Sequence, residues 1–295
     1  MKSTGLGLQG MLIVGLITFG MIARSNAQER VQEPGSRQIK KTVPLSVNGE
    51  VSIEAFKGSI TIKAWDRPEV DIQARIEAAG LATREREAVN KVAIRIQANG
   101  GSVTIVSDYD EIKELRPSWT DNWDGSVEYP FVQYTISLPK SAKLTIKDFK
   151  SEINVTGLQA AAHIETFKGP LTVTDVKGDL RVNSYKGRVR ITGLDGSLDL
   201  ETQKSEVEIE FVHLTARSRI DSFKGDVQIT LPKTAGFELD ADIGSKGDIR
   251  SDFDLTVLSS SKNRRNNDSF RGEVNGGGPR LTLRTTKGYY RVRQR

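Results

Sequence analysis

The sequence predicts an all-β protein, a single-chain β-helix-like β-solenoid with coils of about 18 residues, two short strands per coil and one short helix in its N-terminal part. A lysine-containing motif recurs at a fixed interval, which is typical of a solenoid. Apolar and polar residues alternate along most of the chain, which indicates half-buried strands. The 27 glycines and the aromatic content of 6% suit many short strands joined by tight turns.

Residues 1–27 have the pattern of a secretory signal peptide. Lys2 precedes the apolar run from Met11 to Ala23, and Ser25-Asn26-Ala27 supplies the small residues of a cleavage site. The apolar run is short for a membrane span. We therefore expect the mature protein to begin near Gln28, and retention of the segment as an N-terminal anchor is the alternative.

The remainder divides into a polar segment and one domain. Residues 28–42 are expected to be flexible, and a single continuous domain is expected over 43–295. Within this domain, 43–130 forms a β-rich N-terminal part and 131–295 forms the β-solenoid repeats. The alternating pattern begins at Val43, which sets the first boundary.

The N-terminal part combines strands, a helix and a loop. Alternation at Val51-Ser52-Ile53 and Ile60-Thr61-Ile62 predicts strands, and Phe56-Lys57-Gly58 is an early copy of the repeated motif. The helix is expected at residues 82–91. The acidic, aromatic and proline-containing segment 108–130 breaks the alternation and predicts a long loop.

The repeated motif sets the register of the solenoid. Its later copies follow after 20 and then 22 residues, which indicates small insertions in the last coils. The copies at the 18-residue interval are Asp148-Phe149-Lys150-Ser151, Thr166-Phe167-Lys168-Gly169, Ser184-Tyr185-Lys186-Gly187 and Thr202-Gln203-Lys204-Ser205, and the later ones are Ser222-Phe223-Lys224-Gly225 and Gly244-Ser245-Lys246-Gly247.

Equivalent residues of successive coils should stack about 4.8 Å apart, so each repeat position becomes a column. The predicted inward columns contain Ile153, Leu171, Val189, Val207 and Val227; Val155, Val173, Ile191, Ile209 and Ile229; Ala162, Leu180 and Leu198; and Ile164, Val182 and Leu200. The same register places opposite charges together in the pairs Arg188 with Glu206, Arg190 with Glu208, and Arg181 with Asp199. Glycines 169, 187 and 225 are expected at corners that need positive φ.

Several chemistries are excluded or disfavoured. The chain has no cysteine, so disulfides and thiolate sites are excluded. Only His163 and His213 are available as imidazole bases, and both are expected to be solvated surface residues. No catalytic or nucleotide-binding motif is present. Removal of the signal segment takes away Lys2 and Arg24, so the formal net charge falls from +5 to 5 − 2 = +3, which is too mild to indicate nucleic-acid binding.

The repeats, a recurring Leu-Pro-Lys-x-Ala step and the C-terminal ending resemble the DUF4097-type family of bacterial exported β-strand repeat proteins, grouped as candidate adhesins. The step occurs at 138–142 and 231–235, and the ending runs from Gly276 to Gly288. The resemblance extends over 43–295. It implies a structural repeat without catalytic residues, and only the family label implies adhesion. The aromatic segment 107–129 looks longer than that family usually carries.

Lysines form the first candidate binding site. Lys150, Lys168, Lys186, Lys204 and Lys224 occupy one repeat position and should lie well within a Debye length of one another. An anionic polymer could neutralise the positive charges of this column. Alternatively, the lysines extend into water and prevent aggregation by edge pairing.

Two tryptophans form the second candidate. Trp119 and Trp123 lie in the polar loop and could stack on sugar rings or on a partner protein. They could equally fold back and cover one end of the solenoid. The neighbouring stretch 121–125 lacks the full pattern of a calcium loop, so no metal site is predicted.

These features predict an exported, non-enzymatic β-solenoid that presents a repetitive surface for binding or adhesion at the bacterial cell envelope, in the periplasm or at the cell surface. The expected partner is an envelope glycan or protein, with no cofactor and no nucleic acid. After signal cleavage the protein is not expected to be an integral membrane protein. The alternatives are a carbohydrate-active β-helix enzyme and a self-assembling envelope scaffold.

Overall fold

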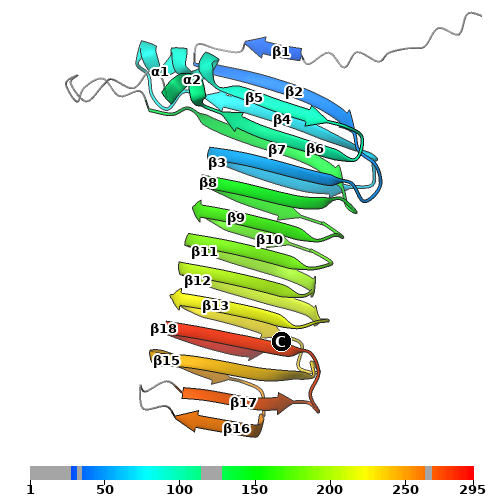
Figure 1. Cartoon of the computed structure of the whole chain (residues 1–295), viewed down its shortest axis with the longest axis vertical. Coiled ribbons are helices and arrows are strands. Elements are labelled where there is room, and N and C mark those ends of the chain that lie inside the picture. The colour runs from blue at the N-terminus through cyan, green and yellow to red at the C-terminus, as the bar shows by residue number, and fades with distance from the viewer. Residues whose placement is uncertain (1–27, 32–34, 114–127, 263–267) are drawn as a thin grey trace, which may run out of the picture.

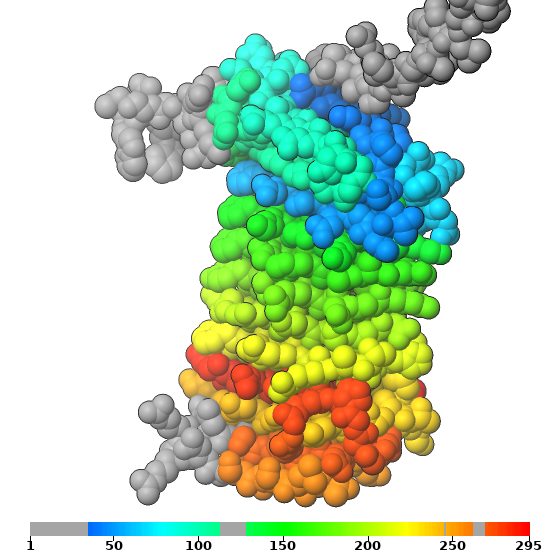
Figure 2. All heavy atoms as spheres, turned by 45° about the vertical axis from the view of Figure 1, so that its right-hand side comes forward, coloured from blue at the N-terminus to red at the C-terminus, as the bar shows by residue number. Residues whose placement is uncertain are grey.

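Strands stacked across one long axis make up almost all of the structure (Figure 1). The computed structural model of the chain describes residues 28–31, 35–113, 128–262 and 268–295. The all-β prediction is confirmed, and the stack is β-solenoid-like. Figure 2 shows the coils as successive bands of side chains between the two ends of the molecule.

Parallel strands with an 18-residue offset form the middle of the stack. Leu171 pairs with Ile153 on one side and with Val189 on the other, as the repeat period predicted. The strands of this region are β8 (Lys143–Thr156), β9 (Ala162–Lys168), β10 (Leu171–Thr174), β11 (Leu180–Gly196), β12 (Leu198–Leu214), β13 (Ser218–Lys224) and β14 (Val227–Leu231).

The core lies between the two legs of each coil. Every residue of the predicted inward columns is buried, which confirms those columns. Burial of this kind stabilises the fold by about 1.5–3 kcal/mol for each fully buried aliphatic side chain before conformational entropy is counted. The alternating apolar residues therefore hold the coils together.

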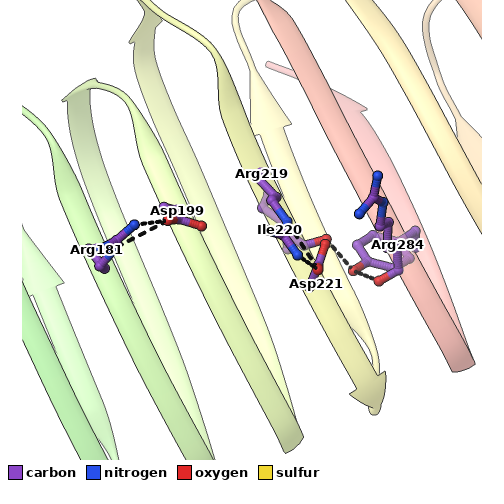
Figure 3. Close-up of polar contacts among 7 residues, drawn as sticks. Arg181, Asp199, Arg219, Ile220, Asp221 and Arg284 are labelled. Atoms are coloured by element: carbon purple, nitrogen blue, oxygen red, sulfur yellow. Dashed lines mark hydrogen bonds and ion pairs between the residues drawn. The ribbon is translucent and has the colours of Figure 1, made fainter.

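Charge pairs connect neighbouring coils on the outside. Arg181 bonds Asp199 at 2.8 Å, as Figure 3 shows, while the Arg188–Glu206 and Arg190–Glu208 pairs measure 3.0 and 2.8 Å. These distances confirm the predicted pairing. Because the pairs are solvent-exposed, each contributes only about 0.2–1 kcal/mol, so they support the register more than the stability.

The N-terminal end closes the stack with antiparallel strands. On the side of β3 (Glu50–Trp65) away from β8, β6 pairs with its first half and β7 with its second half, both in parallel. Strands β5, β4, β2 and β1 then add antiparallel neighbours. The bounds are β1 (Gln28–Val31), β2 (Ser36–Pro44), β4 (Glu69–Glu77), β5 (Ala93–Ala98), β6 (Ser102–Asp108) and β7 (Phe131–Pro139).

Two expectations for this end need correction, and the expected helix is confirmed. Residues 28–42, expected to be flexible, contribute β1 and most of β2, because β2 pairs with β4 along its whole length. The predicted helix is present as α1 (Thr83–Ala88) followed by η1 (Val89–Lys91). A further short helix, α2 (Asp110–Lys113), lies within the segment expected to be only a loop.

At the C-terminal end, the order of strands in space departs from the order in sequence. The last strand, β18 (Arg280–Gln294), lies between β13 and β14 on one side and β15 (Phe237–Ser251) on the other. The antiparallel strands β17 (Asp268–Val274) and β16 (Thr256–Lys262) then cover β15. The motif that follows Lys224 in space is therefore the one at Lys287, and the copy at Lys246 comes after it.

Tyr290 explains part of this arrangement. Its side chain is 1% exposed, and its hydroxyl lies 2.9 Å from the Ile220 carbonyl and 2.8 Å from the Arg284 carbonyl. Burial raises the pKa of this phenol, so it remains a neutral donor. The buried hydrogen bond and the apolar ring fix β18 in the gap beside β13.

Candidate functional site

Eight lysines occupy one column along a corner of the coils. The register pairs Lys168 with Lys186, Lys186 with Lys204, and Lys204 with Lys224. We call this column the lysine ladder; its members in spatial order are Lys57, Lys150, Lys168, Lys186, Lys204, Lys224, Lys287 and Lys246. The structure thus brings the five predicted lysines together and extends their column at both ends.

The central ammonium groups have no anionic partner in the described part of the chain. Lys168, Lys186 and Lys204 are exposed and make no side-chain hydrogen bond or ion pair there. Neighbouring rungs are about 4.8 Å apart, so these positive charges repel one another. The ladder therefore has unused capacity for negative charge.

Glu128 demonstrates this capacity at the N-terminal end. Its carboxylate accepts a hydrogen bond from Lys57, which is only 8% exposed and also lies over the Phe131 ring. This hydrogen bond and the charge of Lys57 lower the pKa of Glu128, and Lys150 lowers it further. One end of the ladder thus already holds a carboxylate.

An aromatic ladder runs beside the lysines, formed by Phe56, Phe149, Phe167 and Tyr185. Successive ring centroids are 5.1, 5.1 and 4.7 Å apart, with planes within 7° of parallel. The last three of these residues are 41–44% exposed. Each inner ring is covered on both faces by its neighbours, so the ladder presents mainly ring edges to solvent.

The aromatic ladder is interrupted at Gln203. This glutamine takes the next position after Tyr185, and a ring returns one rung later at Phe223, which is 44% exposed. Within the described residues Phe223 has no aromatic neighbour, although Lys287 Nζ lies 5.8 Å from its centroid. The outer face of Tyr185 is therefore free of ring contacts.

A groove follows the aromatic ladder on the side away from the lysines. It consists of two hollows of about 520 and 380 Å³ that share Glu201 and Gln203 as lining residues. The first hollow includes Phe167 and Tyr185, and the second includes Phe223. The break in the aromatic ladder thus lies where the two hollows meet.

Small polar side chains line the base of the groove. They lie between the aromatic ladder and the lining residues Glu165, Asn183, Glu201 and Asp221. They are almost completely buried: Thr166, Ser184, Thr202, Ser222 and Thr285. The base of the groove is consequently polar.

Asp148 begins this polar column and is the acid most affected by burial. It accepts hydrogen bonds from the Ser151 amide at 2.8 Å, the Ser151 hydroxyl at 2.6 Å and the Thr166 hydroxyl at 3.2 Å. Burial raises its pKa above the ordinary range of aspartate, although these hydrogen bonds oppose the increase.

This raised pKa predicts a pH-dependent stability. Between the ordinary aspartate pKa and the raised value, folded Asp148 keeps a proton that the unfolded chain has released, so the free energy of unfolding falls as pH rises. The wild type should therefore lose stability relative to Asp148→Asn as the pH rises above the ordinary aspartate pKa of 3.8. Urea unfolding of both proteins at several pH values measures this difference, and curves that stay parallel would contradict the burial of the carboxyl.

The remaining candidates from the sequence are placed as follows. Trp119 and Trp123 lie outside the described residues. Sequence reasoning also missed the stacking of the aromatic side chains and the groove residues Asn183, Glu201 and Gln203. For the aromatic side chains a signal was present, because Phe149, Phe167 and Tyr185 recur at the same 18-residue interval as the lysines.

The fold and this corner define a β-solenoid-like protein with a repeated lysine and aromatic edge. The family model described as Toastrack DUF4097 matches residues 48–288, so the chain belongs to the Toastrack DUF4097 family, as the resemblance predicted. Among curated proteins, none matches the chain. No helix in the described ranges has the length and apolar character needed to cross a membrane.

Two solved structures are similar to this chain at 11% identity. One is a candidate cell adhesion protein from Clostridium sporogenes, with a TM-score of 0.35, and the match covers 87% of this chain and 99% of that one. The other is a candidate lipid binding protein from Parabacteroides distasonis, with a TM-score of 0.34 and coverage of 86% and 96%. At these TM-scores, neither similarity bears on the function of this chain.

Proposed function

We propose that the protein is an exported, non-enzymatic binding module of the cell envelope, whose lysine ladder binds a linear anionic polymer along the long axis. The observation that carries the proposal is the line of exposed, unpaired ammonium groups in register on successive coils. An anion bound there gains attraction and relieves the repulsion between rungs.

The charges around the ladder favour a narrow ligand. Acidic side chains stand in the outward columns on both sides of the corner, with Glu165, Glu201 and Asp221 beyond the aromatic ladder and Glu206 and Asp226 on the other side. Basic residues share these columns, because Lys147 and Arg284 lie in the first and Arg188, the partner of Glu206, lies in the second. A broad anionic surface would meet these carboxylates as well as the lysines. A thread-like polyanion can follow the lysines and avoid the acids.

Export and location in the envelope rest on residues 1–27, which lie outside the described residues. Their charged start, apolar run and small-residue cleavage site support passage through a secretory pathway. A polymer of the cell envelope would then be the polyanion within reach. The partner is therefore proposed to be an envelope glycan or another anionic envelope polymer.

Removal of three central charges tests the proposal. The triple variant Lys168→Gln, Lys186→Gln and Lys204→Gln should bind polygalacturonate and polyphosphate about ten- to a hundred-fold more weakly at low salt, since each ammonium contributes up to about 1 kcal/mol. Its affinity should also depend less on salt. The matched control is Lys63→Gln, Lys177→Gln and Lys233→Gln, which removes the same charge from exposed positions outside the ladder. Calorimetric titration across a salt series gives both quantities.

Two other outcomes would indicate a different site or a different function. If the ladder variant binds envelope material normally but Trp119→Ala with Trp123→Ala does not, the site is the aromatic loop, with a sugar or protein partner. If neither variant differs from wild type, the end-to-end scaffold replaces the binding module. Its structural basis would be the outer edge of β16, which has no strand partner in the described part and exposes Val257 and Leu258.

A further inference from the structure

We propose that the break in the aromatic ladder at Gln203 is a subsite for a single sugar ring, and that the polymer on the lysine ladder is therefore an acidic polysaccharide. The inference rests on the proposed binding of a polyanion and names its chemical class. It is carried by three features of one place: free aromatic faces, unused polar side chains, and the meeting of two hollows.

The aromatic faces at the break differ from those elsewhere in the ladder. Phe149 and Phe167 are covered on both faces, whereas Tyr185 is stacked only on Phe167 and leaves its other face toward the Gln203 rung. Phe223 stands two rungs beyond Tyr185, about 10 Å away along the axis. A saturated sugar ring packs its C–H groups against an aromatic face. The break therefore offers uncovered aromatic faces, which the rungs with stacked rings do not.

The polar side chains at the break match sugar hydroxyls. Asn183, Glu201 and Gln203 line the groove and make no side-chain hydrogen bond or ion pair with the rest of the described chain. The two amides can both donate and accept, and the carboxylate accepts. A sugar hydroxyl likewise donates and accepts, so one ring can satisfy all three side chains.

Other ligands fit this place less well. A polyphosphate carries acceptors only, and the Glu201 carboxylate would repel it. An acyl chain would cover the three polar side chains without satisfying their hydrogen bonds, which is costly. The same rungs carry Lys186, Lys204 and Lys224, so a sugar in the groove can direct an acidic substituent toward the ladder.

The substitution Gln203→Phe tests the subsite directly. It would place a ring between Tyr185 and Phe223 and so fill the break by continuing an existing stack, which the fold already accommodates in the preceding rungs. We expect a melting temperature no lower than that of wild type, at least about a tenfold loss of affinity for polygalacturonate, and unchanged affinity for polyphosphate.

Thr286→Phe is the matched control. Thr286 is exposed, occupies the same column on the other side of Phe223 and lines the second hollow beyond the break, so this variant adds a ring to the groove without filling the break. It should bind polygalacturonate like wild type. A second variant, Asn183→Ala, should weaken polygalacturonate binding alone, because it removes a hydrogen-bonding group without changing the charge of the ladder.

Each result has one meaning. Equal loss of both polymers in Gln203→Phe, or no loss of either, would overturn the sugar subsite while the polyanion function stands. Wild-type binding to phosphatidylglycerol vesicles but not to polygalacturonate would overturn it in favour of a lipid surface. If wild type binds neither polymer nor vesicles, the proposed function itself fails. Specific loss of polygalacturonate binding in Gln203→Phe, with Thr286→Phe unaffected, supports the subsite.

Discussion

Gly187→Ala is expected to destabilise the protein by on the order of 3 kcal/mol or more, because it combines backbone strain with a collision. Gly187 has a φ of +150° at the corner of its coil. An added Cβ would lie 2.0 Å from the carbonyl oxygen of Gly169 in the neighbouring coil. Since that oxygen belongs to a backbone held on both sides by strands, it has no room to move away.

Gly100→Ala separates the two causes. Gly100 also has a positive φ, of +81°, but an added Cβ there would meet nothing within 4 Å. Strain alone should cost only about 1–2 kcal/mol. Urea unfolding of both variants measures the difference, and equal losses would mean that the coils do not approach each other as closely as the structure indicates.

Ile191→Ala is expected to cost about 2–5 kcal/mol, because it leaves a cavity within a buried column. Ile191 is fully buried and lies between Val173 and Ile209 on the adjacent coils. In a stack of rungs, a missing side chain removes contacts on both sides, and neither neighbour can shift without breaking its own ladder of hydrogen bonds.

An exposed residue supplies the comparison for this core change. Val257→Ala removes two methyl groups from a side chain that is 62% exposed, so the free energy of unfolding should change by less than about 0.5 kcal/mol. Denaturant unfolding monitored by circular dichroism distinguishes the two variants. A loss below about 0.5 kcal/mol in Ile191→Ala would be incompatible with a buried column.

The regular part of the fold was predictable because each coil copies the one before it. A single offset of 18 residues assigns Val189 to Leu171 and Glu206 to Arg188, and both pairings are present in the structure. Parallel in-register stacking converts sequence period directly into spatial neighbours, so the predicted lysines had to meet once the coils formed. The positive φ values of Gly169, Gly187 and Gly225 follow from the same register.

The ends of the stack were not predictable in this way. The sequence contains the motif at Lys287 and the one at Lys246, but their period does not say which lies next to Lys224. That choice depends on which strand edge is available, and β18 takes the edge beside β13 because Tyr290, Leu283 and Val292 are buried there. Strand pairing over such a sequence distance is decided by burial across the whole molecule.

The amino-acid sequence by itself therefore determined the all-β class, the columns of the core and the five-lysine core of the ladder, since all three follow from one local period. The tertiary structure alone decided that the side chains at Phe149, Phe167 and Tyr185 turn outward and stack, and that the groove beside them opens at Gln203. The physical reason is the bend at each corner. It directs two consecutive side chains outward, which a simple alternation of strand residues does not predict.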